Sequence, residues 1–183
     1  MTEYFAGAYW GPRSQSRAAC AQRISAFIGS LARIDGALGA WFRKIPTREA
    51  ARIAFGSTPA DIEPLLKGQR RDIGGEAMTA LGFNFAAWNG NDGLTASMAA
   101  TCGASVPMLR NSVVPSFEPI SSSSPDSLQQ ILRAAVEAFQ PTGGLAASNE
   151  LLASYPQQSP WTLPAPFQYH ESTTGFTRFW SWR

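Results

Sequence analysis

The chain has little charge, and this shortage excludes two classes of protein. Of its 183 residues, 15 are Lys or Arg and 13 are Asp or Glu, which leaves a net charge of +2. Binding to nucleic acid through its phosphates needs a much larger basic excess, so we expect no nucleic acid partner. Disorder is excluded as well, because disordered chains are poor in aromatics, whereas this one has 11 Phe and 6 Trp.

Side chains that ligate metals or act as nucleophiles are also scarce. Cys20 and Cys102 are the two cysteines, and His170 is the single histidine. Metal sites need several such ligands at short spacing. The sequence also lacks the G-x-S-x-G, Walker, G-x-G-x-x-G and H-E-x-x-H motifs of common enzymes. We therefore expect no metal, no cofactor and no enzymatic activity, with both thiols reduced and buried. A small enzyme that uses His170 or Cys102 is the weakest alternative.

Long hydrophobic runs are missing too. No apolar run approaches the ~20 residues of a membrane-spanning helix. The first residues, MTEYFAGAYWGPR, lack the basic and apolar regions of a signal peptide. We expect a cytoplasmic protein with no membrane partner. The length favours a single domain over residues 1–183.

Apolar residues at three- and four-residue spacing predict helices. The two clearest run over residues 16–34 and 125–139. A shorter helix is predicted over 38–45, where Pro46 closes it. Another begins at Thr58, because Thr58-Pro59-Ala60-Asp61 combines a capping hydroxyl, Pro at the first position and an acid at the third.

A period of two residues predicts strands, and Asn89-Gly90-Asn91-Asp92-Gly93 is typical of a hairpin loop between two of them. No stretch of helix length separates the strands between residues 83 and 114, so they form an antiparallel meander. We expect an α+β domain, an antiparallel sheet with helices packed on it. The prolines of residues 156–175 predict an irregular segment there. The predicted strands are 4–10, 83–88, 94–102, 109–114, 145–148 and 176–182.

One stretch of the chain, residues 61–76, gathers acidic side chains. It forms either a solvated charged loop paired with Arg70 and Arg71, or an acidic face that meets a basic partner. Its carboxylates are those of Asp61, Glu63, Asp72 and Glu76.

Tryptophans fall into two groups. Periodicity assigns Trp41 and Trp88 to the core. Trp180 and Trp182 share one face of the last predicted strand, where they are either core residues or partner contacts.

Four short blocks in a fixed order resemble one protein family. They are Tyr9-Trp10-Gly11-Pro12-Arg13, Gly82-Phe83 leading to Trp88-Asn89-Gly90, Cys102-Gly103, and Asn111-Ser112-Val113-Val114. In this order and spacing they resemble the immunity protein 52 family of bacterial polymorphic toxin systems. The resemblance extends from the N-terminus to about residue 150, and beyond it only a helix and a terminal strand are similar.

The resemblance implies a non-enzymatic inhibitor in bacterial competition. Such a protein binds and neutralises a cognate nuclease toxin of restriction-endonuclease fold, often an effector of a type VI secretion system, by direct stoichiometric contact in the cytoplasm. The alternative is a chaperone or adaptor for a secreted effector. The motif residues Trp10, Gly11, Pro12, Arg13, Trp88, Asn89 and Gly90 are interpreted as fold determinants rather than as contacts.

The net charge departs from this pattern, because nuclease inhibitors tend to be acidic and nuclease active sites basic. With a charge of +2, the protein either presents the acids of residues 61–76 to the toxin or blocks the toxin away from its catalytic cleft.

Overall fold

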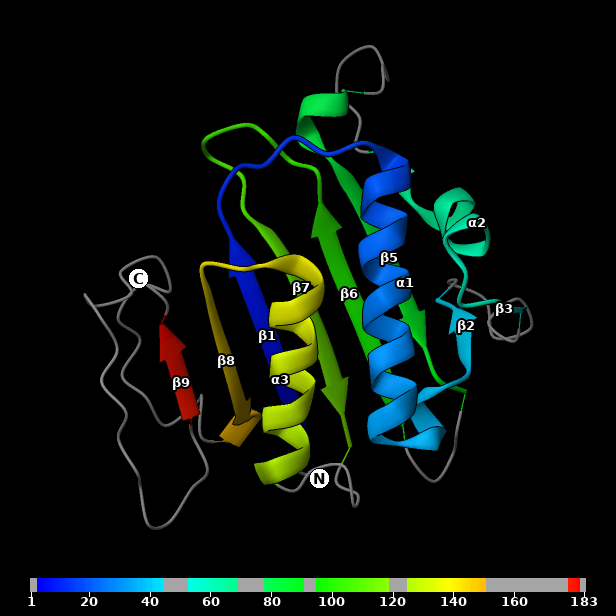
Figure 1. The fold of residues 1–183 in the computed structure, drawn as a ribbon, viewed down its shortest axis with the longest axis vertical. Helices are drawn as coiled ribbons and strands as arrows, with labels where there is room; N and C mark the ends of the chain where they lie inside the picture. The colour runs from blue at the N-terminus through cyan, green and yellow to red at the C-terminus, as the bar shows by residue number, and fades with distance from the viewer. Residues whose placement is uncertain are drawn as a thin grey trace.

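The structure, a computed structural model, describes residues 3–44, 53–68, 78–90, 95–118, 125–150 and 178–181. These residues form one nine-stranded antiparallel sheet with helices on one of its faces (Figure 1). The α+β class and the antiparallel sheet are thereby confirmed. The predicted irregular segment 156–175 lies outside the described residues.

The elements follow the chain in an order close to the expected one. Short 3₁₀ helices, η1 (Gly36–Leu38), η3 (Glu63–Leu65) and η4 (Thr79–Leu81), lie between them. The helices are α1 (Arg17–Ile34), α2 (Pro59–Ile62) and α3 (Pro125–Phe139). The strands are β1 (Tyr4–Trp10), β2 (Trp41–Arg43), β3 (Ala54–Phe55), β4 (Lys67–Gly68), β5 (Phe83–Trp88), β6 (Ala96–Cys102), β7 (Asn111–Phe117), β8 (Gly143–Ser148) and β9 (Arg178–Ser181).

The sheet has the strand order β3-β2-β5-β6-β7-β1-β8-β9, and β4 pairs with β5 beside β2. The predicted meander is confirmed, because β5, β6 and β7 are adjacent and antiparallel. The first strand of the chain lies inside the sheet, where β1 pairs with β7 on one side and β8 on the other. The sheet therefore joins segments that are more than 100 residues apart.

The predicted helix over residues 38–45 is wrong. Residues Gly36–Leu38 form the single turn η1, and Trp41–Arg43 form strand β2. The helical spacing of Leu38, Trp41 and Phe42 competes here with pairing to β5, in which Phe42 lies opposite Trp88. Aromatic residues favour strands when they pack against a neighbouring strand, so the tertiary contact decides the local structure.

The helix predicted from Thr58 is confirmed, but it is short. Thr58 and Asp61 form the predicted capping box, and Pro59 occupies the first helical position. Pro64 cannot donate the next helical hydrogen bond, and the chain continues as η3. Residues Lys67–Gly68 then pair with β5 as strand β4.

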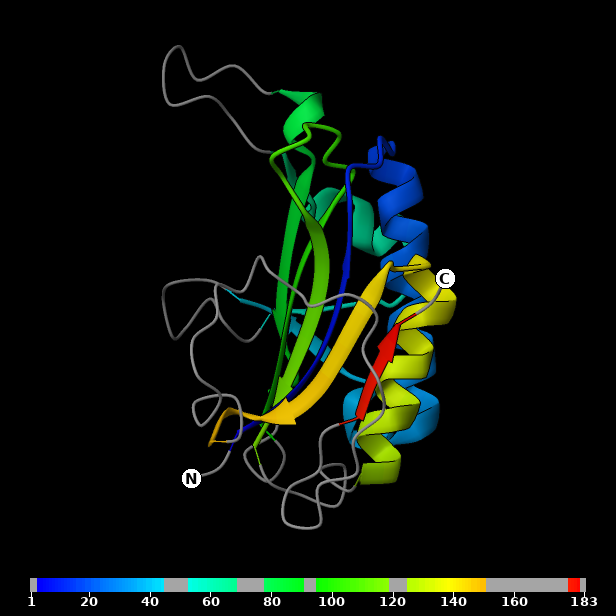
Figure 2. The same ribbon diagram turned by 90° about the vertical axis from the view of Figure 1, so that its left-hand side faces the viewer.

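The two long helices pack side by side on the same face of the sheet (Figure 2). Ser16 caps α1 by accepting a hydrogen bond from the Ala19 N–H at 3.1 Å. Phe27 of α1 meets Phe139 of α3 edge to face, with ring centroids 5.7 Å apart. Neither these helices nor the others in the described part of the chain have the length and apolar content to span a bilayer.

Alternation of burial along β5, β6 and β7 separates the sheet there into an inner face, below the helices, and an open face on the other side. The inner face is apolar and almost fully buried, with Ala6, Ala8, Trp10, Phe83, Phe85, Met98, Val113 and Phe117 among its residues. On the open face, the side chains of β5, β6 and β7 are those of Asn84, Ala86, Trp88, Ser97, Ala99, Thr101, Ser112, Val114 and Ser116.

Candidate partner-binding surfaces

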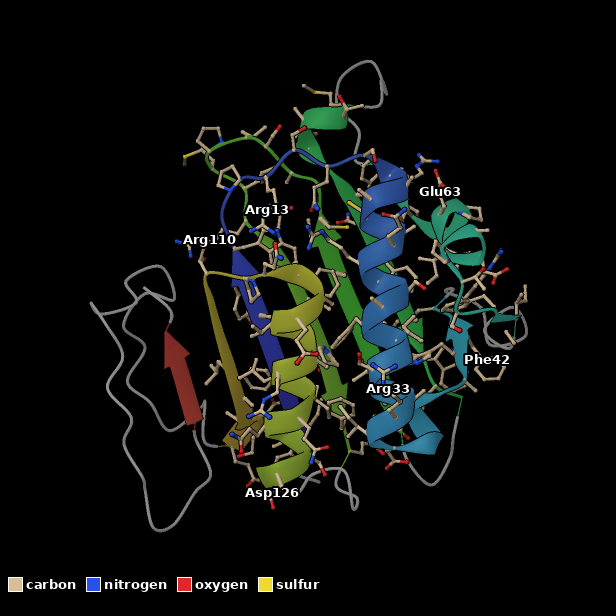
Figure 3. The ribbon with its side chains drawn as sticks, in the orientation of Figure 1. Arg13, Arg33, Phe42, Glu63, Arg110 and Asp126 are labelled. Atoms are coloured by element: carbon tan, nitrogen blue, oxygen red, sulfur yellow. The ribbon has the colours of Figure 1, made fainter. Side chains whose placement is uncertain are left out.

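Arg13, in the Tyr9–Arg13 motif, contacts the end of α3. Its guanidinium donates hydrogen bonds to the carbonyl oxygens of Phe139 at 2.7 Å and Gln140 at 2.9 Å. Arg23 of α1 donates to the neighbouring carbonyl of Ala138 at 2.8 Å. Figure 3 shows Arg13 at the opposite end of α3 from Asp126. Two cations therefore satisfy carbonyl groups that a helix C-terminus leaves without partners, where the helix dipole is negative.

The environment of Arg13 also changes its acidity. Burial lowers the pKa of the Arg13 guanidinium, and the nearby positive charge of Arg23 lowers it further. The guanidinium lies 6.0 Å from the ring centroid of Trp10. Trp10 itself is 1% exposed and stacks on Phe139 with ring centroids 5.2 Å apart. Both motif residues thus hold α3 against β1, while Pro12 between them is exposed.

Asn111 joins two other motif blocks and is fully buried. Its Oδ1 accepts from the Ala104 N–H at 2.9 Å, and its Nδ2 donates to the carbonyls of Ala104 at 3.0 Å and Gly11 at 2.8 Å. The Arg13 N–H also donates to the Ala104 carbonyl, at 2.7 Å. One side chain therefore fastens the β6–β7 loop to the segment after β1. Sequence reasoning quoted Asn111 in a motif but assigned it no role.

The Trp88-Asn89-Gly90 block lies at the end of β5. Asn89 is 3% exposed, and its Oδ1 accepts from the Ala96 N–H at 2.9 Å across the hairpin. Gly90 has a positive φ of 64°, and an added Cβ would lie 2.6 Å from Cδ2 of Phe42. Only glycine fits such a position without strain.

The two tryptophans assigned to the core by periodicity have different environments. Trp41 is 2% exposed, which confirms that prediction. Trp88 lies on the open face and is half-buried against Phe42, with ring centroids 5.9 Å apart. It is therefore a partly accessible aromatic beside the open face rather than a core residue.

Of the acidic stretch, the structure describes two carboxylates. Asp61 Oδ2 accepts hydrogen bonds from the hydroxyl of Thr58 at 2.5 Å and the Thr58 N–H at 3.3 Å, so this side chain serves its own helix cap. Glu63 is half-buried at the start of η3, on the α2 side of the molecule (Figure 3). Asp72 and Glu76 lie outside the described residues. The described part of the chain thus places Asp61 at the cap of α2 and Glu63 at the start of η3.

Of the two tryptophans near the C-terminus, the structure describes one. Trp180 belongs to β9, where its backbone pairs with Gly144 of β8. Trp182 lies outside the described residues.

Both cysteines are buried free thiols, Cys20 on α1 and Cys102 on β6. The interaction between the two thiols lowers the pKa of the Cys20 thiol and raises the pKa of Cys102, which burial raises further. Cys102 is thus held in its protonated form, and the thiolate is the nucleophilic form of cysteine. His170, the other candidate for catalysis, lies outside the described residues. Within those residues, no group of three or more His, Cys, Asp or Glu is placed to hold a metal ion.

Comparison with known protein families gives a match. No curated protein shows a significant similarity to the chain. The family model described as Immunity protein 52 matches residues 2–181. The match spans nearly the whole chain and includes every block that carried the resemblance. The chain therefore belongs to the immunity protein 52 family, whose members are immunity proteins of toxin–immunity systems with a protein toxin as partner.

Proposed function

We propose that this protein binds and neutralises a cognate nuclease toxin by direct, stoichiometric contact in the cytoplasm. The match to the immunity protein 52 family over residues 2–181 carries the proposal. We further propose that the toxin has a restriction-endonuclease fold and is an effector of a type VI secretion system used in bacterial competition. A standard interface of roughly 1,600 Å² in total would be enough for such a complex.

The contacts of the polar side chains support a binding role rather than a catalytic one. The guanidinium of Arg13 and the side chains of Asn89, Asn111 and Asp61 all bind backbone groups of the protein itself. Catalytic side chains must instead reach a substrate within hydrogen-bonding distance. These four groups therefore stabilise the fold, and we infer that the protein functions by binding a partner through its surface.

A protection assay tests this function directly. The toxin encoded next to this gene is expressed with and without the protein, and growth is followed. We expect full protection, co-elution of the purified pair in equal amounts, and loss of nuclease activity upon stoichiometric addition. A toxin from an unrelated pair is the control, and it should stay active.

Cell death despite abundant, soluble immunity protein would contradict the proposal. The chaperone or adaptor alternative predicts a different phenotype, in which deletion of the gene abolishes secretion of the effector but leaves the cell protected.

The acidic stretch gives an electrostatic version of the contact. In this version, the alternative to a contact away from the catalytic cleft, the acidic contacts are Asp61, Glu63, Asp72 and Glu76, and the aromatic ones are Trp180 and Trp182. Asp61 also serves the cap of its own helix. If this stretch meets a basic toxin surface, replacing Asp72 and Glu76 by Arg together weakens binding, most of all at low salt. Unchanged affinity of that double variant at low salt would place the contact elsewhere on the protein.

A further inference from the structure

The open face of the sheet is ordered in rows. Hydrogen-bonded register aligns Ala86 with Ala99 and Val114 in a central apolar row across β5, β6 and β7. On one side of it lies the row of Asn84, Thr101 and Ser112, and on the other the row of Trp88, Ser97 and Ser116. Each row consists of side chains that lie next to one another on one face.

The central row is accessible. Ala86 and Ala99 are exposed, and Val114 is half-buried. Because these side chains are small, the face over the three strands is flat, and a partner can approach the backbone closely.

Aromatic rings border this flat area on both sides. Trp88 packs against Phe42 of β2 on one side, with a centroid distance of 5.9 Å. On the other side the ring of Tyr9 of β1 lies over Gly7, since a Cβ added there would lie 2.8 Å from Tyr9 Cζ. Burial raises the pKa of the Tyr9 hydroxyl, so this ring is held against the sheet rather than extended into water.

The nine described open-face positions of β5, β6 and β7 carry no charged side chain. Lys67 of β4 lies opposite Asn84 and places one charge at a corner of this face. Arg23, Arg33, Arg133 and Glu137 belong instead to the helices α1 and α3, which form the other layer of the molecule (Figure 2). An antiparallel sheet that faces only water normally alternates buried apolar with solvated polar and charged residues. An apolar centre between polar rows, with aromatics at the border and no charge on β5, β6 and β7, is instead the composition of a protein–protein interface core.

Size and composition identify the kind of partner. At a rise of about 3.3 Å per residue and a strand spacing of about 4.8 Å, the face over β5, β6 and β7 covers roughly 300 Å². A standard interface needs roughly 800 Å² on each partner, whereas obligate homodimers bury far larger and more apolar areas. Ala, Ser and Thr provide too little apolar area for such a dimer. The face therefore fits the centre of a non-obligate contact with a different protein.

We propose that the open face of β5, β6 and β7 is the docking surface for the toxin, and that it meets an uncharged toxin surface rather than the basic nucleic-acid cleft. This inference rests on the proposed function. It explains how a protein of charge +2 can inhibit a nuclease, since binding through this face needs no imitation of phosphate charge.

A matched pair of arginine substitutions tests the proposal. Ala99→Arg places a long cation at the centre of the open face, and Ala18→Arg makes the same change at an exposed position of α1 on the helix side. Binding to the purified toxin is measured by calorimetry, and folding by circular dichroism and thermal unfolding. We expect Ala99→Arg to fold normally but to bind at least 100-fold more weakly, and Ala18→Arg to bind as the wild type does. Wild-type affinity should change less than about threefold between 50 and 500 mM salt, because few charges are paired.

The outcomes separate this proposal from the function on which it rests. Wild-type affinity in Ala99→Arg, or loss of binding in Ala18→Arg alone, overturns the docking surface while the function stands. A wild-type homodimer that Ala99→Arg dissociates, with toxin binding unchanged, also overturns it, because the face then serves self-association. If Ala99→Arg unfolds, a triple variant that combines Ala86→Ser, Ala99→Ser and Val114→Asp is tested in its place. The same loss of binding is expected for this variant. No binding by the wild-type chain overturns the function, and the docking surface with it.

Discussion

Single side chains replace missing backbone partners at the ends of the strands. In the described part of the chain, Asn89 and Asn111 are buried polar residues, and each bonds backbone groups across a loop. Buried backbone N–H and C=O groups need such partners, because leaving one unpaired costs about 1–3 kcal/mol. The loops that carry the family motifs are therefore held as firmly as the strands that they connect.

Gly82 provides a sharp test at the residue scale. It has a positive φ of 78°, and an added Cβ would lie 2.5 Å from the Ala104 nitrogen and 2.6 Å from the Cys102 oxygen. Gly82→Ala should lower the free energy of unfolding by about 2–3 kcal/mol, from backbone strain and displacement of the β6–β7 loop. Chemical denaturation measures the change.

Gly29, inside α1, is the matched control. A Cβ there meets no atom within 4 Å, so Gly29→Ala should stabilise the protein by about 0.5–1 kcal/mol through helix propensity. Equal effects of the two substitutions would contradict the geometry at Gly82.

At the scale of elements, the C-terminus of α3 depends on residues far away in the chain. The helix ends where Gln140 adopts a positive φ of 50°, a common helix-ending conformation. Arg13 and Arg23 then supply the hydrogen-bond donors that the last carbonyls need. The C-terminal end of α3 therefore contributes to its packing against β1 and α1, in addition to its apolar face.

Replacement of Arg13 tests this attachment. Arg13→Ala removes two charge-assisted hydrogen bonds and the contact with Trp10, and it should lower the free energy of unfolding by about 2 kcal/mol. Urea denaturation followed by tryptophan fluorescence gives the value. Arg33→Ala is the control, because Arg33 is exposed and donates to Ser30 within the same helix, and it should cost under about 0.5 kcal/mol. A loss at Arg33 as large as that at Arg13 would contradict the capping role.

At the scale of the whole molecule, one sheet unites the described parts of the chain. β1 lies between β7 and β8, and β9 extends the same sheet. Neither the N-terminal nor the C-terminal half of the described chain can form this sheet alone, because β1 from the N-terminal half pairs with β7 and β8 from the C-terminal half. We therefore propose that residues 1–183 form a single domain that folds as one unit.

Equilibrium unfolding tests this unity. Far-ultraviolet circular dichroism, which follows the backbone, and tryptophan fluorescence, which follows packing, should give one coincident transition with a single midpoint. Two separate midpoints would contradict a single cooperative domain.

Local signals in the sequence predicted most of the elements. The 18-residue helix α1 and the 15-residue helix α3 follow from apolar spacing and capping, which act over a few neighbouring residues. β1 and β5 were predicted with the bounds that the structure has, and the Thr58 capping box was read directly from four consecutive residues. The helix predicted over 38–45 failed because it rested on helical spacing alone, whereas the pairing of Phe42 with Trp88 of β5 makes this segment a strand.

The amino-acid sequence by itself determined the fold class, the main elements and the family, since these depend on periodicity, caps and the order of short motifs. Only the tertiary structure decided what each motif side chain does and which face of the sheet stays open. Alternation along a strand marks two faces but does not say which one the helices cover. Where Arg13 or Asn111 finds its partners depends on strands and helices brought together from distant parts of the chain, and no local pattern encodes that meeting.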